Sequence, residues 1–329
     1  MDPLSSVLDT IKLSGVIFLR ANLGDRFGIE MPPATLSHPM LRPPTPEHRL
    51  VMFHIICEGS GWVEIEGAEP RQLEQGDLII VIDDVVHAVV DRPGQAKVRS
   101  ADVSPIFAPI ATPPAVEVGE GPRTLRMVCG MLQFVERGIS PVFSALPPYL
   151  HIRRDDGPSS RWLNANINHI IEEVESGRPG TEALLSRLTE LMFVETLRTY
   201  LRTLPSEERG WFAALRDPVV GAVIEAMHTQ PTEPWTVAQL ARKVAVSRSV
   251  LAARFSALLG VSPIAYLTRW RIRLATNLLE DASLSLADVA ERVGYESESA
   301  FNRAFKREMD VPPATWRKQR EARLPQLRR

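Results

Sequence analysis

Cysteine and long hydrophobic runs are nearly absent from this sequence. Its 329 residues include only two cysteines, Cys57 and Cys129. Two thiols are too few for a disulfide framework and are typical of proteins kept in a reducing cytosol. No apolar stretch approaches the ~18 residues of a membrane-spanning helix, and no basic flank precedes an apolar run near the N-terminus. These absences exclude a disulfide-stapled secreted domain and predict a soluble, cytoplasmic protein with no membrane partner.

A strong net charge is also absent, because the formal total is only −2. This total hides an asymmetry between the two ends of the chain. Residues 216–329 hold 18 Lys and Arg against 12 Asp and Glu, a net of +6, whereas residues 1–215 hold 20 against 28, a net of −8. A basic end on an acidic body is typical of a chain of which one part contacts nucleic acid. A solvated basic face is the alternative explanation.

The C-terminal part contains an internal duplication. The stretch TVAQLARKVAVSRSVLAARFSALLGVSP (residues 236–263) returns as SLADVAERVGYESESAFNRAFKREMDVPP (residues 285–313). Matching residues such as Ala241 and Ala290 lie 49 positions apart, and those after one inserted residue lie 50 apart. Each copy has a short amphipathic segment, a break, and a second segment opened by serine. This pattern predicts two helix-turn-helix units.

The second helix of each copy is the expected recognition helix. Ser247 and Ser297 stand at its N-cap, where free backbone N–H groups and the positive end of the helix dipole suit phosphate. We interpret the apolar positions, such as Phe255 and Phe305, as core and the other side chains as the DNA-facing set. That set is Ser247, Arg248, Ser249, Arg254, Ser297, Glu298, Ser299, Asn302, Arg303 and Lys306.

Within this set, side-chain chemistry assigns different roles. Arginine can bind guanine bidentately and asparagine can do the same to adenine, so Arg303 and Asn302 are candidate base readers. Arg254 and Lys306 are expected at phosphates, which position the protein without reading sequence. Glu298 could accept from cytosine N4 or exclude other bases by repulsion. For any single arginine, a solvated surface group remains the alternative.

The N-terminal part has a different pattern. After an amphipathic helix expected in residues 1–15, short β-rich runs alternate with turn residues. Strands are expected at residues 15–23, 50–57, 61–65, 78–82, 88–90 and 127–134. Their close spacing predicts a β-barrel or sandwich. Helices are expected at residues 160–175 and 182–204, and the broad apolar stripe of the second covers the barrel or forms a dimer seam.

Three stretches resemble known families. Residues 286–318, LADVAERVGYESESAFNRAFKREMDVPPATWRK, resemble the DNA-binding domain of AraC/XylS regulators. Residues 53–67 (FHIICEGSGWVEIEG) and 73–90 (LEQGDLIIVIDDVVHAVV) resemble the cupin barrel fused to such regulators. The resemblance implies a multidomain α+β chain. An N-terminal cupin-like β-barrel is followed by helices and by an all-α domain with two helix-turn-helix motifs.

The resemblance also implies a domain division. It places an effector-sensing domain in residues 1–155, a helical dimerisation segment in residues 156–208 and the DNA-binding domain in residues 209–329. The two helix-turn-helix units would occupy about residues 236–259 and 285–308, joined by a helix over 263–280. The first recognition helix has alanines at positions where the family often carries larger base readers. The second is therefore expected to read more of the sequence.

The cupin metal site is retained only in part. Gly76 to His87 fits the spacing G-x5-P-x-G-x2-H, but Ile82 stands in place of the proline. In the first motif, Met52 occupies the glutamate position and only His48 remains of two histidines. A metal cupin needs three or four convergent ligands. We therefore expect no metal and no cofactor.

Four residues of the barrel remain candidates for sensing. His54, His87 and Trp62 are candidate parts of an effector pocket, and the alternative is that both histidines are simply hydrogen-bonded inside the barrel. Cys129 is either a buried thiol that packs as a small hydrophobe or a sensor of oxidants. The second interpretation needs access and a lowered thiol pKa, and only Arg126 supplies positive charge nearby in the sequence.

The resemblance implies an effector-responsive transcription regulator that is not an enzyme. It implies double-stranded promoter DNA, RNA polymerase, an unknown small-molecule effector and a second copy of the chain as partners, and activation rather than repression. A signal in the barrel would change how the helices of residues 160–204 hold the DNA-binding domains. Two alternatives stay open. One is a metal-dependent cupin enzyme with an appended DNA-binding domain, and the other is a constitutive DNA-binding protein whose barrel is only a dimerisation scaffold.

Overall fold

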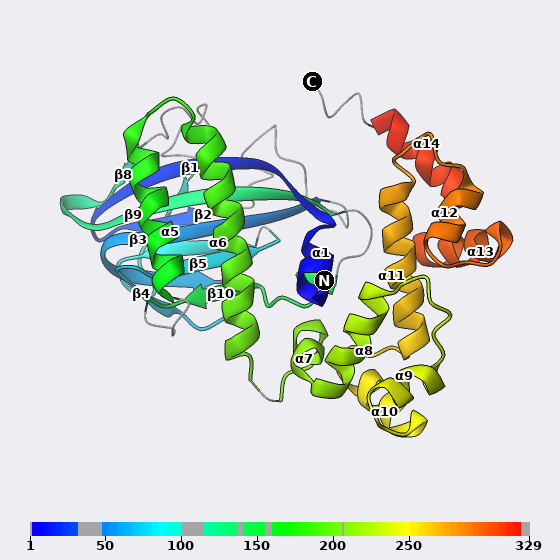
Figure 1. Cartoon of the computed structure of the whole chain (residues 1–329). Coiled ribbons are helices and arrows are strands. Elements are labelled where there is room, and N and C mark those ends of the chain that lie inside the picture. Colours follow the sequence, from blue (N-terminus) through cyan, green and yellow to red (C-terminus); the bar gives the residue numbers. More distant parts are fainter. Residues whose placement is uncertain are drawn as a thin grey trace. The chain divides into compact units, whose positions relative to one another are not determined.

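The chain divides into two compact units (Figure 1). The computed structural model describes residues 2–31, 48–83, 85–100, 115–136, 141–154, 160–205 and 207–323. The sheet unit contains Leu13–Val135 and Leu146–Thr203, and the helical unit contains Met1–Lys12, Glu136–Ala145 and Leu204–Arg329. The helices expected as a separate dimerisation segment thus group with the sheet. The first twelve residues, expected in the sensor domain, group with the helices of the C-terminal part.

The sheet unit has ten strands within the described residues. They are β1 (Ile11–Asp25), β2 (Gly28–Met31), β3 (His48–Ile65), β4 (Arg71–Glu74), β5 (Leu78–Ile82), β6 (His87–Val90), β7 (Val98–Arg99), β8 (Ala115–Val118), β9 (Glu120–Glu136) and β10 (Tyr149–Ile152). Seven strands follow the order β7-β2-β6-β3-β9-β1-β8, while β4 and β5 pair with β3 and β10 pairs with β5. Figure 1 shows the sheet curling into a half-barrel, which confirms the expected fold class.

β3 is the centre of the sheet because it pairs with β4, β5, β6 and β9. The break expected between strands at residues 50–57 and 61–65 is wrong, since β3 runs on through residues 58–60. Its pairing with β9 shifts register between Ile56 and Glu58, which is a β-bulge. Gly59 has a φ of +79°, and a Cβ there would lie 1.8 Å from the carbonyl oxygen of Thr124. This glycine therefore serves close approach between strands rather than a turn.

The N-terminal helix is shorter than expected. Helix α1 (Pro3–Leu8) begins at the N-cap Asp2, whose carboxylate accepts from the Ser5 backbone N–H, and ends at Asp9. The chain is already in β1 from Ile11 onward, so the second half of the helix predicted for residues 1–15 is wrong. The backbone there forms strand hydrogen bonds with the sheet, and such tertiary pairing outweighs the weak local helical pattern.

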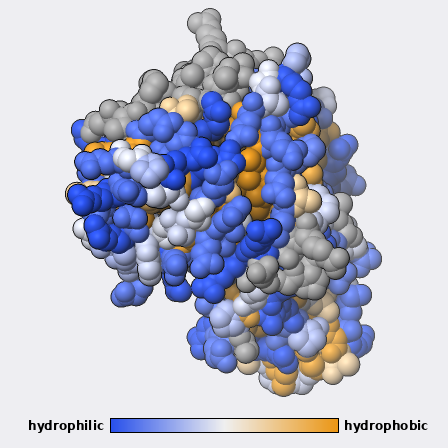
Figure 2. Space-filling model, turned by 90° about the vertical axis from the view of Figure 1, so that its left-hand side faces the viewer, coloured by the Kyte–Doolittle hydropathy of each residue, from blue (hydrophilic) through white to orange (hydrophobic). Residues whose placement is uncertain are grey.

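Helices α5 (Ser160–Ser176) and α6 (Thr181–Thr203) pack against each other and cover one face of the sheet (Figure 1). Phe193 of α6 lies against Phe134 of β9, with ring centroids 4.8 Å apart. The broad apolar stripe is therefore divided, because Leu185 and Met192 are buried while Leu184 and Leu191 are exposed. Most of the molecular face in Figure 2 is hydrophilic, and hydrophobic residues gather there in narrower bands.

The helical unit consists of short helices around small apolar cores. They are α4 (Pro141–Ser144), α7 (Trp211–Arg216), α8 (Pro218–Thr229), α9 (Val237–Lys243), α10 (Arg248–Leu259), α11 (Pro263–Leu278), α12 (Leu286–Arg292), α13 (Glu298–Met309) and α14 (Pro313–Arg323), together with α1. Helix α11 joins the two duplicated segments and contacts α10, α12 and α13. Within the described ranges no single helix is long and apolar enough to cross a membrane, and α10 with α11 passes on length and composition only as a pair bent by 56°.

Candidate nucleic-acid interface and sensor site

The two duplicated segments fold as matching helix-turn-helix units. Helices α9 and α12 both begin with a capping box, formed by Thr236 with Gln239 and by Ser285 with Asp288. In each box the cap hydroxyl accepts from the backbone N–H three residues on, and the later side chain reaches back to the cap's own N–H. The same local chemistry at both places explains why two divergent stretches start helices at equivalent positions.

The turn inside each unit needs a left-handed residue. It is Ala245, with a φ of +54°, in the first unit and Gly294, with a φ of +82°, in the second. A Cβ on Gly294 would lie 2.6 Å from the Cα of Thr232, so this position has no room for a side chain. The first unit accepts alanine in a conformation that costs an L-residue about 1–2 kcal/mol.

The expected N-caps of the recognition helices are confirmed. Ser247 Oγ accepts from the N–H of Val250 at 3.2 Å, and Ser297 Oγ accepts from that of Ala300 at 3.3 Å. Each cap hydroxyl also lies within hydrogen-bonding distance of the serine two residues on, at 3.0 Å in α10 and 3.2 Å in α13. The two recognition helices therefore begin with the same hydrogen-bond pattern.

The core side of each recognition helix also follows the sequence prediction. Leu251 and Phe255 of α10 are buried, as are Phe301, Ala304 and Phe305 of α13. Two further positions expected in the core, Leu258 and Ala300, are only half-buried. With the apolar side fixed against the rest of the unit, the opposite side of each helix is turned to solvent.

The DNA-facing set lies on that solvent side. Ser247, Arg248, Ser249, Arg254, Ser297, Glu298, Ser299, Arg303 and Lys306 are exposed, and Asn302 is half-buried. In the described part of the chain, Arg248, Arg303 and Lys306 form no ion pair or hydrogen bond of their side chains. Exposed cations without acidic partners suit contact with phosphates and base edges.

Besides the serines of the two N-caps, Arg254 and Asn302 have side-chain partners within the protein. The Nε of Arg254 lies 2.6 Å from Asp217 Oδ2, while the other oxygen of this carboxylate caps α8 through the N–H groups of Val219 and Val220. Arg254 thus ties α10 to the start of α8, a contact that sequence reasoning did not find. Asn302 Nδ2 lies 3.5 Å from Glu298 Oε1.

In the sheet unit, three of the candidate sensing residues form one cluster. His54 on β3 and Cys129 on β9 are directly opposite in the antiparallel register. The His54 Nδ1 atom lies 2.9 Å from Cys129 Sγ, and its Nε2 atom lies 2.8 Å from His87 Nε2. His87 Nδ1 lies 2.8 Å from the carbonyl oxygen of Val85. We call Cys129, His54 and His87 the thiol–imidazole chain.

The Val85 carbonyl at the end of the thiol–imidazole chain fixes where its protons lie. Because the Val85 oxygen can only accept, the Nδ1 of His87 must donate, and a neutral His87 then accepts at Nε2. His54 therefore donates from Nε2 and accepts at Nδ1 from the Cys129 S–H. All three groups are neutral in this arrangement, and all four ring nitrogens are used.

Burial favours this neutral state. Desolvation, followed by the charge of His87, holds the pKa of His54 well below its usual range. Desolvation also lowers the pKa of His87 to about 4, while its bond to Val85 opposes the shift. The pKa of the Cys129 thiol is raised by burial and, less strongly, by Cys57. The resting thiol–imidazole chain is therefore a thiol and two imidazoles rather than a thiolate–imidazolium pair.

Trp62 and Arg126 do not lie where they were expected from the sequence. Trp62 does not join the histidines, because its neighbour Val63 faces the inner core and successive strand residues face opposite sides. Arg126 pairs with Glu58 at 2.9 Å and Glu175 at 2.5 Å rather than lying beside Cys129. Its charge lowers the pKa of Cys57, which burial nevertheless raises to about 11.

Metal binding has no support among the residues that the structure describes, where no three His, Cys, Asp or Glu side chains form a group that could hold an ion. The side chain of His48 lies outside the described part of the chain. Both ring nitrogens of His54 have partners within the protein.

Two helix-turn-helix units joined by one helix define a DNA-binding protein, and the curled sheet defines a cupin-type domain beside it. Comparisons agree with both. Residues 2–202 match a family model described as Cupin, and residues 240–319 match one described as Helix-turn-helix domain.

Known proteins share this organisation. The chain is 33% identical over 319 residues to a putative AraC-like transcription regulator of Streptomyces lividans, which covers 97% of this chain and 98% of that protein. It is 31% identical over 192 residues to the RCS-specific HTH-type transcriptional activator RclR of Escherichia coli (strain K12), with 58% and 67% covered. The DNA-binding domain of AdpA, solved in complex with a target DNA, is 33% identical over 33% of this chain and 98% of that one, with a TM-score of 0.31. This chain belongs to the AraC-like transcription regulators, and it is a regulator rather than an enzyme.

Proposed function

We propose that this regulator is an activator that responds to oxidation of Cys129 within the thiol–imidazole chain. The observation that carries the proposal is the continuous hydrogen-bonded connection from Cys129 Sγ through His54 to His87. A change at the sulfur is thereby coupled to two strands beyond its own. The name of one relative, the RCS-specific HTH-type transcriptional activator RclR, supports activation rather than repression.

A redox signal fits this cluster better than a small-molecule effector. The four ring nitrogens of His54 and His87 already have partners within the protein, so an effector would have to displace those bonds to use them. The sequence predicted an effector pocket formed by His54, His87 and Trp62. Our proposal replaces this pocket with a redox site at Cys129. Cys129 is buried, with 8% of the residue exposed, so only a small oxidant is proposed to reach its sulfur.

The neutral state of the Cys129 thiol determines which oxidants react with it. Nucleophilic attack on peroxide requires the thiolate, and burial raises the pKa of Cys129, so reaction with hydrogen peroxide is slow. Hypochlorous acid is a stronger two-electron oxidant. It would replace the S–H bond by S–OH, with chloride and one proton released, and the sulfur would stand at the sulfenic level.

The added oxygen would disturb a closely packed interior. Cys129 belongs to the same apolar core as Met52, Val89 and Met131, and such interiors have few voids. The new S–OH also changes the distance between the sulfur and His54 Nδ1. The disturbance would move β3 relative to β5, which pairs with β10, and β10 contacts α6. Helix α6 ends at Thr203, where the chain enters the helical unit.

A promoter reporter tests the proposal. The reporter carries a promoter that the purified protein binds. Treatment of cells with hypochlorous acid should change transcription from this promoter by about 5- to 150-fold, which is the range of typical allosteric coupling. Cys129→Ser should abolish the response, because the hydroxyl keeps a donor for His54 but cannot be oxidised. Cys57→Ser is the matched control, since Cys57 is also buried and should be dispensable.

An unchanged response in Cys129→Ser would exclude this cysteine as the sensor. A response lost equally in both serine variants would point instead to a disulfide or to a packing defect. Thermal unfolding of each variant separates the packing defect from a loss of sensing.

For DNA binding, we propose that α10 and α13 enter the major groove with the exposed set described above. Arg303 and Asn302 read bases, with Arg248 as the main reader of α10, while Lys306 contacts phosphate. The support is that Arg248, Arg303 and Lys306 are exposed, and Asn302 half-buried, opposite the buried side of each helix. Arg254 is proposed to contact a phosphate. Arginine has five N–H donors, and the pair with Asp217 leaves some of them available for the phosphate.

We further propose that the regulator acts as a homodimer and recruits RNA polymerase. The exposed Leu184 and Leu191 of α6, at 39% and 46% exposure, lie seven residues apart on one helical stripe and support a seam between copies. Analytical ultracentrifugation tests this. Leu191→Asp should shift the protein from dimer to monomer without unfolding it, and a dimer that persists contradicts this seam.

A further inference from the structure

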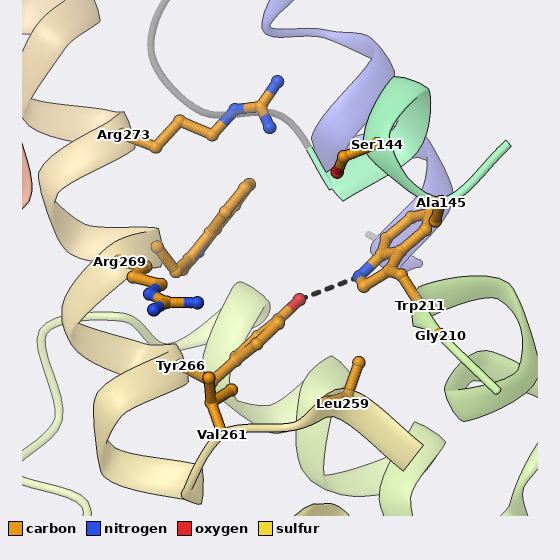
Figure 3. A pocket seen from close by; sticks show the side chains of 10 residues that line it. Ser144, Ala145, Gly210, Trp211, Leu259, Val261, Tyr266, Arg269 and Arg273 are labelled. Carbon is orange, nitrogen blue, oxygen red and sulfur yellow. Dashed lines mark hydrogen bonds between the residues drawn. The ribbon is translucent and has the colours of Figure 1, made fainter.

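The helical unit contains a cavity that neither DNA contact nor the thiol–imidazole chain uses. It has a volume of about 260 Å³ and lies among α7, α11 and the C-terminal ends of α4 and α10 with the residues that follow them (Figure 3). Three aromatic side chains, Trp211, Tyr266 and Trp270, form much of its lining, together with two arginines of α11, Arg269 and Arg273. The whole lining belongs to the helical unit.

The aromatic walls are held in place by a network of contacts. Figure 3 shows Trp211 and Tyr266 pointing toward each other, and the Trp211 Nε1–H donates to the Tyr266 hydroxyl at 2.9 Å. That hydroxyl lies 3.0 Å from His228 Nε2. The His228 ring stacks on Trp270 with centroids 3.8 Å apart and planes 4° apart. Burial, followed by the charge of Arg273, lowers the pKa of His228 to about 3, so the imidazole is neutral and accepts the Tyr266 proton.

The charges of the lining select an anion. Two arginines line the cavity and none of the lining residues is acidic. Arg273 is buried and its Nε donates to Thr10 Oγ1 at 2.8 Å, so its position is fixed by the protein. Arg269 is about half exposed, with its Nε 3.5 Å from Glu308 Oε2, which is a long ion pair that a ligand carboxylate can compete with.

We propose that this cavity binds a small planar aromatic carboxylate. Flat rings suit the aromatic walls, and a carboxylate can accept charge-assisted bonds from the Arg269 guanidinium. The volume lies just below the range of about 300–1,000 Å³ typical of drug-sized ligands, so one or two fused rings fit better than a larger molecule.

The site lies where it can influence DNA binding independently of Cys129. Helix α11 joins the two helix-turn-helix units, and its Arg269 is paired with Glu308 of α13. A carboxylate on Arg269 would release Glu308 from this pair. A ligand that bridges α7 and α11 would thus change how firmly α13 is held.

Titration calorimetry on the full chain tests the proposal with benzoate and 2-naphthoate. At least one should bind, and its neutral amide and its fully saturated ring analogue should bind roughly tenfold more weakly, because each lacks one of the two features that the cavity selects. Arg269→Gln should weaken the carboxylate by a similar factor and leave the amide unchanged. Arg242→Gln is the matched control, since Arg242 is exposed on α9 and does not line the cavity.

Leu259→Trp supplies a second variant that fills the cavity from a half-buried position and should abolish binding of every probe. Thermal unfolding checks that each variant is folded. Absence of binding by both carboxylates at millimolar concentration overturns the proposal. Equal affinity for acid and amide, or binding that survives both Arg269→Gln and Leu259→Trp, overturns it as well. None of these results depends on the response of Cys129.

Discussion

Truncation of Arg303 separates base reading from general DNA affinity. Arg303 is exposed on α13, one helical turn before Lys306, and neither side chain forms an ion pair or hydrogen bond in the described part of the chain. Replacement by alanine therefore removes no described contact within the protein. The free energy of unfolding should stay within about 0.5 kcal/mol of the wild type. Any loss of DNA binding can then be assigned to the interface.

The two substitutions should differ in kind. Arg303→Ala should cost about 1–3 kcal/mol at one base pair of the cognate site, which is roughly 5- to 150-fold, and should relax the preference there. Lys306→Ala should weaken all sequences alike. It should also reduce the slope of log K against log salt by about 0.9, because one phosphate contact is lost.

Fluorescence anisotropy on duplexes that carry every base at each position measures both effects, repeated at several salt concentrations. Arg254→Ala is an informative third variant, since it breaks the 2.6 Å pair with Asp217 and should lower stability as well as affinity. The assigned roles are wrong if Arg303→Ala weakens every duplex equally, or if Lys306→Ala changes base preference and leaves the salt slope intact.

Two further predictions concern stability. Gly294→Ala should destabilise the protein by about 1–3 kcal/mol, because φ is +82° and the Cβ would meet the Thr232 backbone, whereas Ala245→Gly should stabilise it by up to about 1 kcal/mol; chemical denaturation measures both, and equal effects contradict the assigned turns. Burial lowers the pKa of His87 from 6.5 to about 4, so the unfolded chain takes up a proton before the folded one and stability falls as pH drops through this window. Denaturation should show that the free energy of unfolding falls by about 2 kcal/mol between about pH 7 and pH 5 because of His87, and His54 adds to this loss. A free energy of unfolding that does not change with pH would contradict a neutral thiol–imidazole chain.

The helix-turn-helix units could be predicted because their determinants are local. Ser247 and Ser297 cap a helix through the N–H three residues on, and Phe255 and Phe305 repeat at the same place in each copy. Such signals lie within one or two helical turns of the residue that they affect. The duplication also presents each signal twice, which separates it from chance.

The thiol–imidazole chain could not be predicted in the same way. His54 and Cys129 are 75 positions apart and meet only because β3 and β9 pair in one register. A shift by one residue would turn either side chain to the other face of the sheet. The sequence suggested His54, His87 and Cys129 separately, and the pairing of strands brings them together while leaving Trp62 on the opposite face.

Long-range contacts decide other departures from the sequence prediction. Arg254 pairs with Asp217 at a separation of 37 positions, and Arg273 reaches Thr10 across 263. The second contact lies within the helical unit, to which the first twelve residues belong. Amphipathic pattern alone gives no information on which distant segment a side chain meets.

The most direct test of the account is the DNA affinity of the Cys57→Ser protein before and after one equivalent of hypochlorous acid. This variant leaves Cys129 as the only thiol, and mass spectrometry on the same sample establishes whether its sulfur has gained one oxygen. We predict that a single oxidation at Cys129 changes the affinity for the cognate promoter by at least about fivefold, and that a reducing thiol restores it. An oxidised Cys129 with unchanged promoter affinity and unchanged transcription would contradict the account.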